Sequence, residues 1–199
     1  MIDWNEVYAG KEFFYGKEPN EFIKRYYHLI PRKGRVLELA CGEGRNAVFL
    51  AQQGYHVDAV DMSENAIEKT RELAREKGIT INVARFNALK WKPEYKYRGI
   101  VSTFFHTPYD KRVLFYKRVK ELLEYNGIFL GEWFSPLQRL HRFTSGGPPS
   151  YEYMPTIEEL KSNFQNGEVI LLETEERVLM EGHGHRGPAS LIHIIWRKK

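Results

Sequence analysis

Short apolar runs alternate along the chain with segments whose apolar residues recur at helical spacing. Such runs, bounded by polar residues and glycines, are typical of buried strands. The predicted strands are residues 36–40, 55–60, 79–83, 100–104 and 128–134. Helices are predicted between them, ending at Gly54, Gly78 and Gly127, and Ser63 is placed to cap the second one. This alternation implies right-handed crossovers and a parallel sheet that is covered on both faces.

The pattern changes after residue 155. Thr156 and Glu159 have the spacing of a capping box, which predicts a short helix to about Phe164. Two β-rich segments, 168–179 and 189–196, follow with no helix between them, so we expect them to pair as an antiparallel hairpin. The expected fold is therefore α/β: a Rossmann-like three-layer sandwich whose mostly parallel sheet finishes in a C-terminal antiparallel hairpin.

Two stretches are irregular in pattern. Residues 1–30 hold eight aromatic residues and a possible helix from Asn20, and residues 135–155 contain the loop sequence Gly146-Gly147-Pro148-Pro149. We find no internal repeat and no long linker, which predicts a single domain over residues 1–199.

Composition narrows the class of protein. Of 199 residues, 42% are hydrophobic and 28% are charged, as in globular proteins. The net charge is +4, and the basic residues are interleaved with acidic ones along the chain. Nucleic-acid binding is not expected, because basic residues are not gathered on one face. The single cysteine, Cys41, excludes an internal disulfide and a multi-cysteine metal site. No signal-peptide pattern opens the chain and no apolar run approaches roughly 20 residues, so we expect a cytoplasmic protein without a membrane span.

The turn after the first predicted strand carries the candidate chemistry. Gly42 and Gly44 let the backbone turn tightly and let a ligand approach, and Asp61 closes the next strand 19 residues after Gly42, where a carboxylate can bind ribose hydroxyls. A dinucleotide and S-adenosylmethionine both satisfy this pattern. Glu38 and Glu43 place carboxylates where a dinucleotide would lay its diphosphate, which favours the cationic, phosphate-free methyl donor.

The segment from Glu38 to Asn46 resembles motif I of class I methyltransferases. Within that class, motifs along nearly the whole chain are similar to the small tellurite-resistance and thiopurine-type methyltransferases. These motifs are Trp4 with Tyr8, Tyr15-Gly16, Pro19-Asn20, Phe22, Phe105-His106 with Pro108, Gly127 with Glu132, Gly146-Gly147-Pro148, and Glu181-Gly182 with His185 and Gly187.

The resemblance implies a seven-stranded sheet with the methyl donor over its first two strands. It implies that Glu38 and Gly42 hold the amino end of the donor, that Asp61 holds the ribose and that Met62 packs on the adenine. Asn87 stands where the family usually has an acid, and its amide oxygen can still accept the adenine hydrogen bond. The further expected donor contacts are Trp4, Tyr15, Ala40, Gly44, Asn46, Ala88 and Phe104.

Acceptor chemistry is expected at the carboxyl edge of the sheet. His106 follows the fourth strand and His185 follows the sixth, and both are candidate catalytic or substrate-contacting residues, with His183 the weaker candidate. No metal site is expected from these histidines. We expect residues 1–30 to form an aromatic lid and residues 135–155 to form a substrate loop.

The sequence thus predicts a methyltransferase that uses S-adenosylmethionine to methylate a small molecule, such as a thiol, a chalcogen oxyanion or a heterocycle, by in-line displacement. Three alternatives stay open: a dinucleotide-dependent oxidoreductase, a non-catalytic S-adenosylmethionine-binding regulatory module, and an RNA methyltransferase. We expect a monomer or a weak homodimer.

Overall fold

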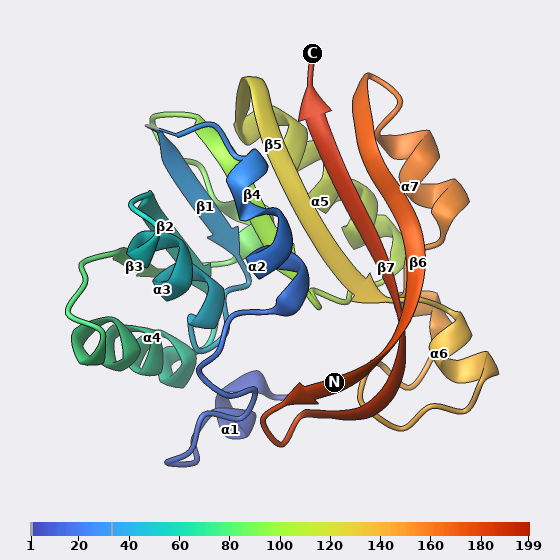
Figure 1. The fold of residues 1–199 in the computed structure, drawn as a ribbon, viewed down its shortest axis with the longest axis horizontal. Helices are drawn as coiled ribbons and strands as arrows, with labels where there is room; N and C mark the ends of the chain where they lie inside the picture. The colour runs from blue at the N-terminus through green and yellow to red at the C-terminus, as the bar shows by residue number, and fades with distance from the viewer. Residues whose placement is uncertain (1, 33) are drawn as a thin grey trace.

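The computed structural model describes residues 2–32 and 34–199. Its centre is a seven-stranded sheet in the order β3-β2-β1-β4-β5-β7-β6 (Figure 1). The first five strands are parallel, and β7 is antiparallel to both of its neighbours. The strands are β1 (Arg35–Leu39), β2 (His56–Asp61), β3 (Asn82–Arg85), β4 (Tyr97–Thr103), β5 (Leu123–Phe134), β6 (Gly167–Glu181) and β7 (His185–Lys198). The predicted fold class is confirmed.

Helices cover both faces of this sheet. On one face α2, α3 and α4 pack over a core that includes Val36, Leu50 and Ile67, and on the other α5 and α7 pack over a core that includes Leu37 and Phe115. Val36 and Leu37 enter different cores because successive strand residues point to opposite faces. The helices are α1 (Trp4–Val7), α2 (Glu21–Tyr26), α3 (Arg45–Gln52), α4 (Glu64–Glu76), α5 (Tyr109–Leu122), α6 (Leu137–Leu140) and α7 (Ile157–Asn163), with 3₁₀ turns η1 (Tyr27–Leu29), η2 (Ala88–Lys90) and η3 (Tyr151–Tyr153).

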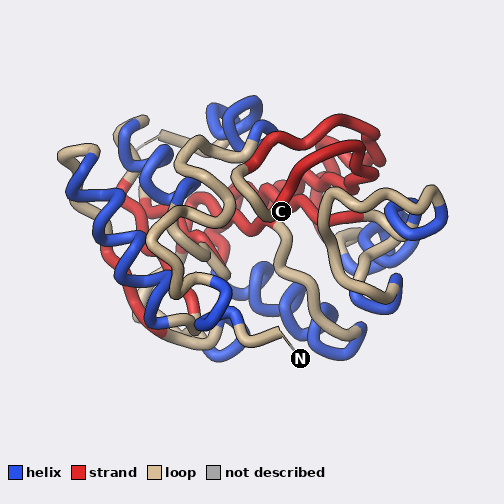
Figure 2. Tube along the Cα trace, turned by 90° about the horizontal axis from the view of Figure 1, so that it is seen from below, coloured by secondary structure: helices blue, strands red, loops and turns tan. Residues whose placement is uncertain are grey.

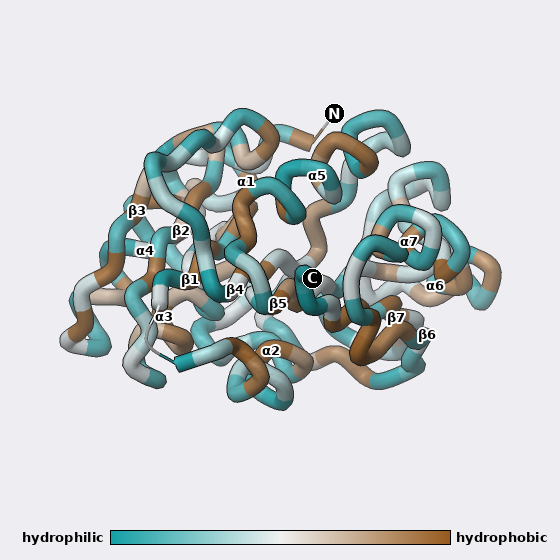
Figure 3. Tube along the Cα trace, turned by 90° about the horizontal axis from the view of Figure 1, so that it is seen from above, coloured by the Kyte–Doolittle hydropathy of each residue, from teal (hydrophilic) through white to brown (hydrophobic). Residues whose placement is uncertain are grey.

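The amphipathic character of the helices is visible in Figure 3, where hydrophobic and hydrophilic residues alternate along them. Two of the predicted caps are present: Ser63 accepts from the amide of Ala66 at the start of α4, and Thr156 accepts from that of Glu159 at the start of α7. No helix in the described part of the chain is both long and apolar enough to cross a membrane.

Several details of the predicted elements were wrong, and β4 begins at Tyr97 and not at residue 100. The third strand begins at Asn82, because Ile79 and Ile81 pack instead against a small apolar cluster between α3 and α4. The helix expected to end near Gly127 ends at Leu122, and Leu123 passes directly into β5, where it pairs with Tyr97. The stretch 135–155 is not entirely loop, since it contains α6 and η3.

The carboxyl ends of β1, β2, β4, β5 and β6 lie at the same edge of the sheet. At this edge the N-terminal segment with α1 lies beside the β6–β7 turn (Figure 1), because the carbonyl of Phe14 accepts the amides of His183 (2.8 Å) and Gly184 (3.0 Å). Figure 2 looks onto this edge and shows loops crossing it. The fold therefore gathers the candidate residues of distant segments at one end of the sheet.

Candidate active site

A cleft opens at the carboxyl edge, between the ends of β1, β2 and β4, the N-terminal segment and the β6–β7 turn. Both predicted catalytic histidines line it. The predicted donor contacts that line it are Trp4, Tyr15, Ala40, Gly42, Asn46, Asp61, Met62, Asn87, Ala88 and Phe104. The remaining lining residues, which were not among the predicted contacts, are Tyr8, Gly16, Cys41, Glu43, Arg45, Thr103 and Phe105.

Two of the predicted donor contacts, Gly44 and Glu38, do not line the cleft. Gly44 has a φ of +81°, and a Cβ there would lie 2.5 Å from Cγ2 of Thr70, so this glycine lets the turn pack closely against α4. Gly42, by contrast, lines the cleft with a φ of +53°, and a Cβ there would lie 3.0 Å from the hydroxyl of Tyr8. Gly44 therefore allows the turn to pack against α4, whereas Gly42 lies against Tyr8 in the cleft.

Glu38 lies behind the cleft wall. Its Oε1 accepts from Nδ2 of Asn46 (2.9 Å), and its Oε2 is buried without a hydrogen-bond partner. Burial raises the pKa of this carboxyl to about 8. Asn46 also donates to Oγ1 of Thr103 (3.2 Å) and accepts from the amide of Asn20 (2.8 Å), so its amide group is held in one orientation between α2, β1 and β4.

Asp61 closes β2 and faces the cleft. Its Oδ2 accepts from the amide of Gly42 (2.9 Å) and its Oδ1 from that of Ser63 (2.9 Å). Burial raises its pKa, although these backbone donors oppose the rise. Each oxygen retains a second lone pair, so this carboxylate can still accept hydrogen bonds from a pair of hydroxyls.

Glu43 does not present a free charge to the cleft, contrary to the sequence-based argument. Its Oε1 pairs with Nζ of Lys69 (2.7 Å), and its Oε2 accepts from the amide of Tyr15 (3.3 Å). Its charge is therefore balanced by α4 and used to hold the N-terminal segment. The carboxylate that faces the cleft beside the turn is Asp61 instead.

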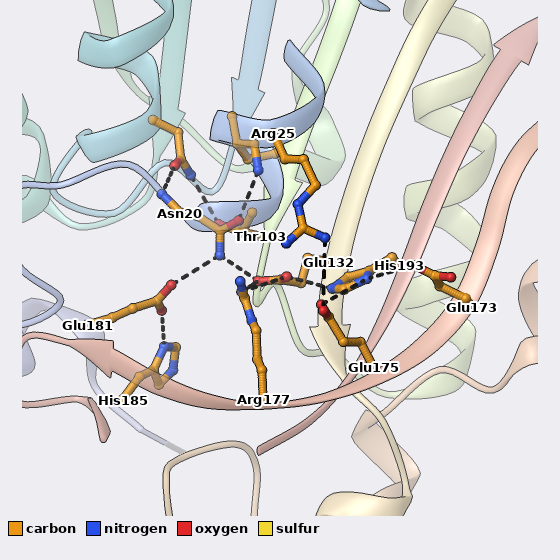
Figure 4. Close-up of polar contacts among 12 residues, drawn as sticks. Asn20, Arg25, Thr103, Glu132, Glu173, Glu175, Arg177, Glu181, His185 and His193 are labelled. Atoms are coloured by element: carbon orange, nitrogen blue, oxygen red, sulfur yellow. Dashed lines mark hydrogen bonds and ion pairs between the residues drawn. The ribbon is translucent and has the colours of Figure 1, made fainter. Parts of the chain in front are cut away.

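His185 stands at the acceptor end of the cleft. Its Nδ1 bonds Oε2 of Glu181 (2.9 Å), as Figure 4 shows. The same carboxylate pairs with Arg45 (3.0 Å). Burial opposes ionisation of Glu181, but Arg45 and His185 together hold its pKa at about 2. Burial also lowers the pKa of His185, although Glu181 opposes this, so burial favours the neutral imidazole. Its Nε2 has no hydrogen-bond partner among the described residues.

An aromatic wall surrounds the His185 imidazole. The ring centroids of Phe104, Tyr15 and Phe134 lie 4.3, 4.4 and 5.1 Å from its own. Phe104 holds a φ of +58°, a conformation that is uncommon for non-glycine residues. A Cβ on Gly146 would lie 2.6 Å from Cδ2 of His185, so part of the predicted substrate loop packs against this histidine.

The surroundings of His106 and His183 are less suitable for accepting a proton from a ligand. His106 lines the cleft, but its Nδ1 contacts the carbonyl of Tyr153 (3.2 Å) and its Nε2 accepts from the amide of Phe134 (3.4 Å). Burial lowers its pKa to about 3. His183 does not line the cleft and pairs with Glu12 at the surface. Among residues 2–32 and 34–199, no group of His, Cys, Asp and Glu side chains could hold a metal ion.

The strand order, the glycine turn and the acid that closes β2 agree with the predicted fold of class I methyltransferases, the class that binds S-adenosylmethionine. Residues 36–127 match the family model described as "Methyltransferase domain". The predicted class and the predicted cofactor are therefore confirmed.

Particular relatives agree with this class. "Thiopurine S-methyltransferase" of Legionella pneumophila (strain Paris) is 39% identical over 67 residues, which are 32% of this chain and 30% of that protein. "Probable S-adenosyl-L-methionine-dependent methyltransferase TehB" of Haemophilus influenzae (strain 10810) is 31% identical over 101 residues, which are 45% of this chain and 35% of that protein. The chain thus aligns with about a third of the length of each.

Solved structures share the fold. The crystal structure of TehB from Haemophilus influenzae superposes with a TM-score of 0.70 at 23% identity, over 90% of this chain and 62% of that one. The CcbJ methyltransferase from Streptomyces caelestis superposes with a TM-score of 0.70 at 19% identity, over 98% of this chain and 96% of that one. At these identities the superpositions establish the fold alone.

Proposed function

We propose that this chain transfers a methyl group from S-adenosylmethionine to a small acceptor that carries a dissociable proton, with a thiol as the acceptor that fits best. The observation that carries this proposal is the Glu181–His185 pair, which places an imidazole with an unpartnered Nε2 in the wall of the cleft. An imidazole so oriented can accept a proton, and the carboxylate on its other nitrogen stabilises the imidazolium that forms.

The cleft fits the methyl donor chemically. Asp61 has free lone pairs for the ribose hydroxyls, and Met62, which is 63% exposed at the cleft, offers an apolar surface to the adenine. Gly42 leaves space at the turn for the donor, and Glu38, which lies behind the cleft wall, would act on it through Asn46, to which it is hydrogen-bonded. The Oδ1 of Asn87 already accepts from the amide of Leu89 (2.9 Å) and can accept once more.

S-adenosylmethionine, when bound, supplies an electrophilic methyl group. The chain's own residues do the rest: the Phe104, Tyr15 and Phe134 rings exclude water, and His185 takes the proton that the acceptor sulfur loses as it bonds to the methyl carbon. Positioning of the two reactants within this wall supplies much of the rate.

A chalcogen oxyanion fits the cleft less well than a thiol. The only Lys or Arg side chain among the described residues that line the cleft is Arg45, and Glu181 already neutralises it. Selenite and tellurite would need an unpaired cation, and they gain little from a base. A neutral acceptor that loses a proton during transfer uses both the apolar wall and His185.

The donor half of this proposal is tested by calorimetry with S-adenosylhomocysteine. We expect micromolar-range binding to the wild type and a loss of about 1–3 kcal/mol in Asp61→Ala, the range for removing a charged hydrogen-bond partner. The control is Glu64→Gln, which changes an exposed side chain at the start of α4, three residues after Asp61. This variant should bind S-adenosylhomocysteine normally. Absence of binding to the folded protein would overturn the proposal.

The acceptor half is tested with two thiols and the His185→Asn variant. Benzyl mercaptan holds its proton at neutral pH, whereas 4-nitrothiophenol is largely ionised. The variant keeps a donor toward Glu181 but lacks the second nitrogen, so we expect kcat/KM to fall about 10²–10⁴-fold with benzyl mercaptan and far less with 4-nitrothiophenol. An equal loss with both thiols would show that His185 is not the base.

A further inference from the structure

A buried polar cluster lies outside the cleft, between α2 and the inner face of the C-terminal hairpin (Figure 4). It consists of Asn20, Glu132, Arg177 and His193, and none of these residues lines the cleft. The Glu132 carboxylate, which is fully buried on β5, accepts from Nη2 of Arg177 (3.0 Å) and pairs with Nε2 of His193 (2.7 Å). The methyl-transfer chemistry does not use these groups directly.

Asn20 connects this cluster to the candidate base. Its Nδ2 donates both to Oε1 of Glu132 (2.5 Å) and to Oε1 of Glu181 (3.2 Å), and Glu181 holds His185 through its other oxygen. Its Oδ1 caps α2 by accepting from the amide of Ile23 (3.2 Å). The side chain of Asn20 therefore uses both of its N–H donors and its acceptor, and it is completely buried.

Helix capping alone does not explain an amide at this position. Serine, threonine and aspartate cap helices as well as asparagine does. Only an amide, however, combines the capping acceptor with two N–H donors that face two carboxylates. Aspartate would cap α2 but would place a third carboxylate beside Glu132 and Glu181, and serine would cap α2 but leave at least one of them without its donor.

The other residues around the cluster hold Asn20 in place. Phe22, two residues further along α2, stacks on the His193 ring with centroids 4.5 Å apart and an interplanar angle of 11°. His193 lies opposite Glu132 in the pairing of β7 with β5. The N-cap of α2 is thus fixed to the sheet by an aromatic stack and by hydrogen bonds.

We propose that Asn20 and Glu132 are positioning residues that set the orientation and the proton affinity of the Glu181–His185 pair. This inference rests on the proposed function, in which His185 takes a proton from the acceptor. By donating to Oε1 of Glu181, Asn20 leaves Oε2 for His185 and limits how strongly the carboxylate attracts a proton on the imidazole. Glu132 holds the Asn20 amide in the orientation that makes this bond.

His185 is faced by charged or titratable groups from several elements, and all must stay constant in a test. They are Glu181 on β6, Arg45 on α3, Glu132 on β5, Tyr15 in the N-terminal segment and His106 in the loop after β4. Substitution at Asn20 removes none of these groups from the chain. The backbone amide of Asn20, which donates to Asn46 in the donor site, is also unchanged by substitution.

The experiment uses Asn20→Ser and Asn20→Asp, both of which retain a cap. The titration of the His185 imidazole is followed by NMR in the presence of S-adenosylhomocysteine, and the pH dependence of kcat for benzyl mercaptan is measured in parallel. We expect the pKa of His185 to rise by a few tenths of a unit in Asn20→Ser, because Glu181 loses an N–H donor, and by about one unit in Asn20→Asp, because a negative charge is also added; both changes favour the imidazolium. The acid limb of the kcat profile should move by the same amount, with KM and the affinity for S-adenosylhomocysteine within about twofold of the wild type.

Two controls separate positioning from stability. Arg25→Ala breaks an exposed α2–β6 contact to Glu175 (3.9 Å), and Thr156→Ala removes the cap of α7; neither should move the His185 titration. If the pKa of His185 were unchanged in folded Asn20→Ser, the inference would be overturned. Asn20→Ser alone is sufficient for this test if Asn20→Asp fails to fold. If the titration shifts as expected while no acceptor is methylated, the positioning role stands and the proposed function fails.

Discussion

Glu38 is a carboxyl group that the fold keeps away from water with one oxygen unpartnered. Burial raises its pKa to about 8, well above the value of about 4.3 expected in the unfolded chain. Between these two values the folded state binds the proton more tightly than the unfolded state does. The contribution of Glu38 to stability is therefore greatest below about pH 4 and is lost as the pH rises toward 8.

This pH dependence can be isolated with Glu38→Gln, which keeps the shape of the protonated side chain. We expect the unfolding free energy of the wild type, measured by urea denaturation without ligand, to fall relative to that of the variant by up to roughly 1.4 kcal/mol per pH unit between pH 5 and 8. If the unfolding free energies of the two proteins changed in parallel with pH, the proposed role of Glu38 would be contradicted. The subtraction removes the contributions of all other titrating groups.

At the scale of single residues, the positions that follow strand ends could be predicted from the sequence. Asp61 and Ala40 line the cleft because the carboxyl ends of parallel strands meet at one edge. Partners from distant segments could not be predicted: Lys69 neutralises Glu43 only because α4 packs beside the turn, and Tyr8 reaches Gly42 only because the N-terminal segment folds over it. Sequence spacing carries no information about such contacts.

At the scale of elements, helix α5 is tied to α7 and to two loops by one buried arginine. Arg112 forms a bidentate ion pair with Glu159 (2.8 and 2.7 Å) and donates to the carbonyls of Thr107 (2.7 Å) and Glu152 (2.6 Å). Tyr116 donates to the same carboxylate (2.7 Å). These loops carry His106 and Tyr153, so this ion pair holds one wall of the cleft.

We expect Arg112→Met to lower the unfolding free energy by roughly 3–5 kcal/mol, because Glu159 would remain buried with its charge unpaired. Combining it with Glu159→Leu should recover part of this loss, since the uncompensated charge is then removed. Urea denaturation of the single and double variants measures both effects. Lys117→Met, which removes only an exposed contact on the same helix, is the control and should change stability by less than about 0.5 kcal/mol. A double variant less stable than the sum of the two single losses would contradict this account.

The same ion pair shows why one element boundary was predictable and another was not. The start of α7 was predicted by its capping box, and Thr156 caps it, but the Glu159 carboxylate turns to Arg112 instead of completing the box. The end of α5 was not predicted, because Leu122 and Leu123 fit a helical stripe and a buried strand equally well. Tertiary pairing of Leu123 with Tyr97 decides between them.

At the scale of the whole molecule, the alternation of strands and helices was sufficient to predict the parallel sheet and its antiparallel hairpin. It could not predict that the N-terminal segment meets the β6–β7 turn. The N-terminal segment and the β6–β7 turn are joined by the carbonyl of Phe14, and a Cβ on Gly182 would lie 2.4 Å from this oxygen. Both segments border the cleft through Tyr15 and His185. A ligand in the cleft therefore contacts both of these segments together with the glycine turn.

This arrangement predicts that donor binding protects three distant segments at once. With S-adenosylhomocysteine at 100 times its Kd, which stabilises a protein by about 2.7 kcal/mol, hydrogen exchange should slow in residues 4–16, 40–46 and 182–185 together. Helix α7, which does not line the cleft, should exchange much as it does without ligand, apart from any global stabilisation. In Gly182→Ala, where the residue has a φ of +58° and the added Cβ meets the Phe14 carbonyl, we expect protection of residues 40–46 to persist and that of residues 4–16 to weaken. Protection confined to residues 40–46 in the wild type would show instead that the N-terminal segment packs at the cleft without responding to the ligand.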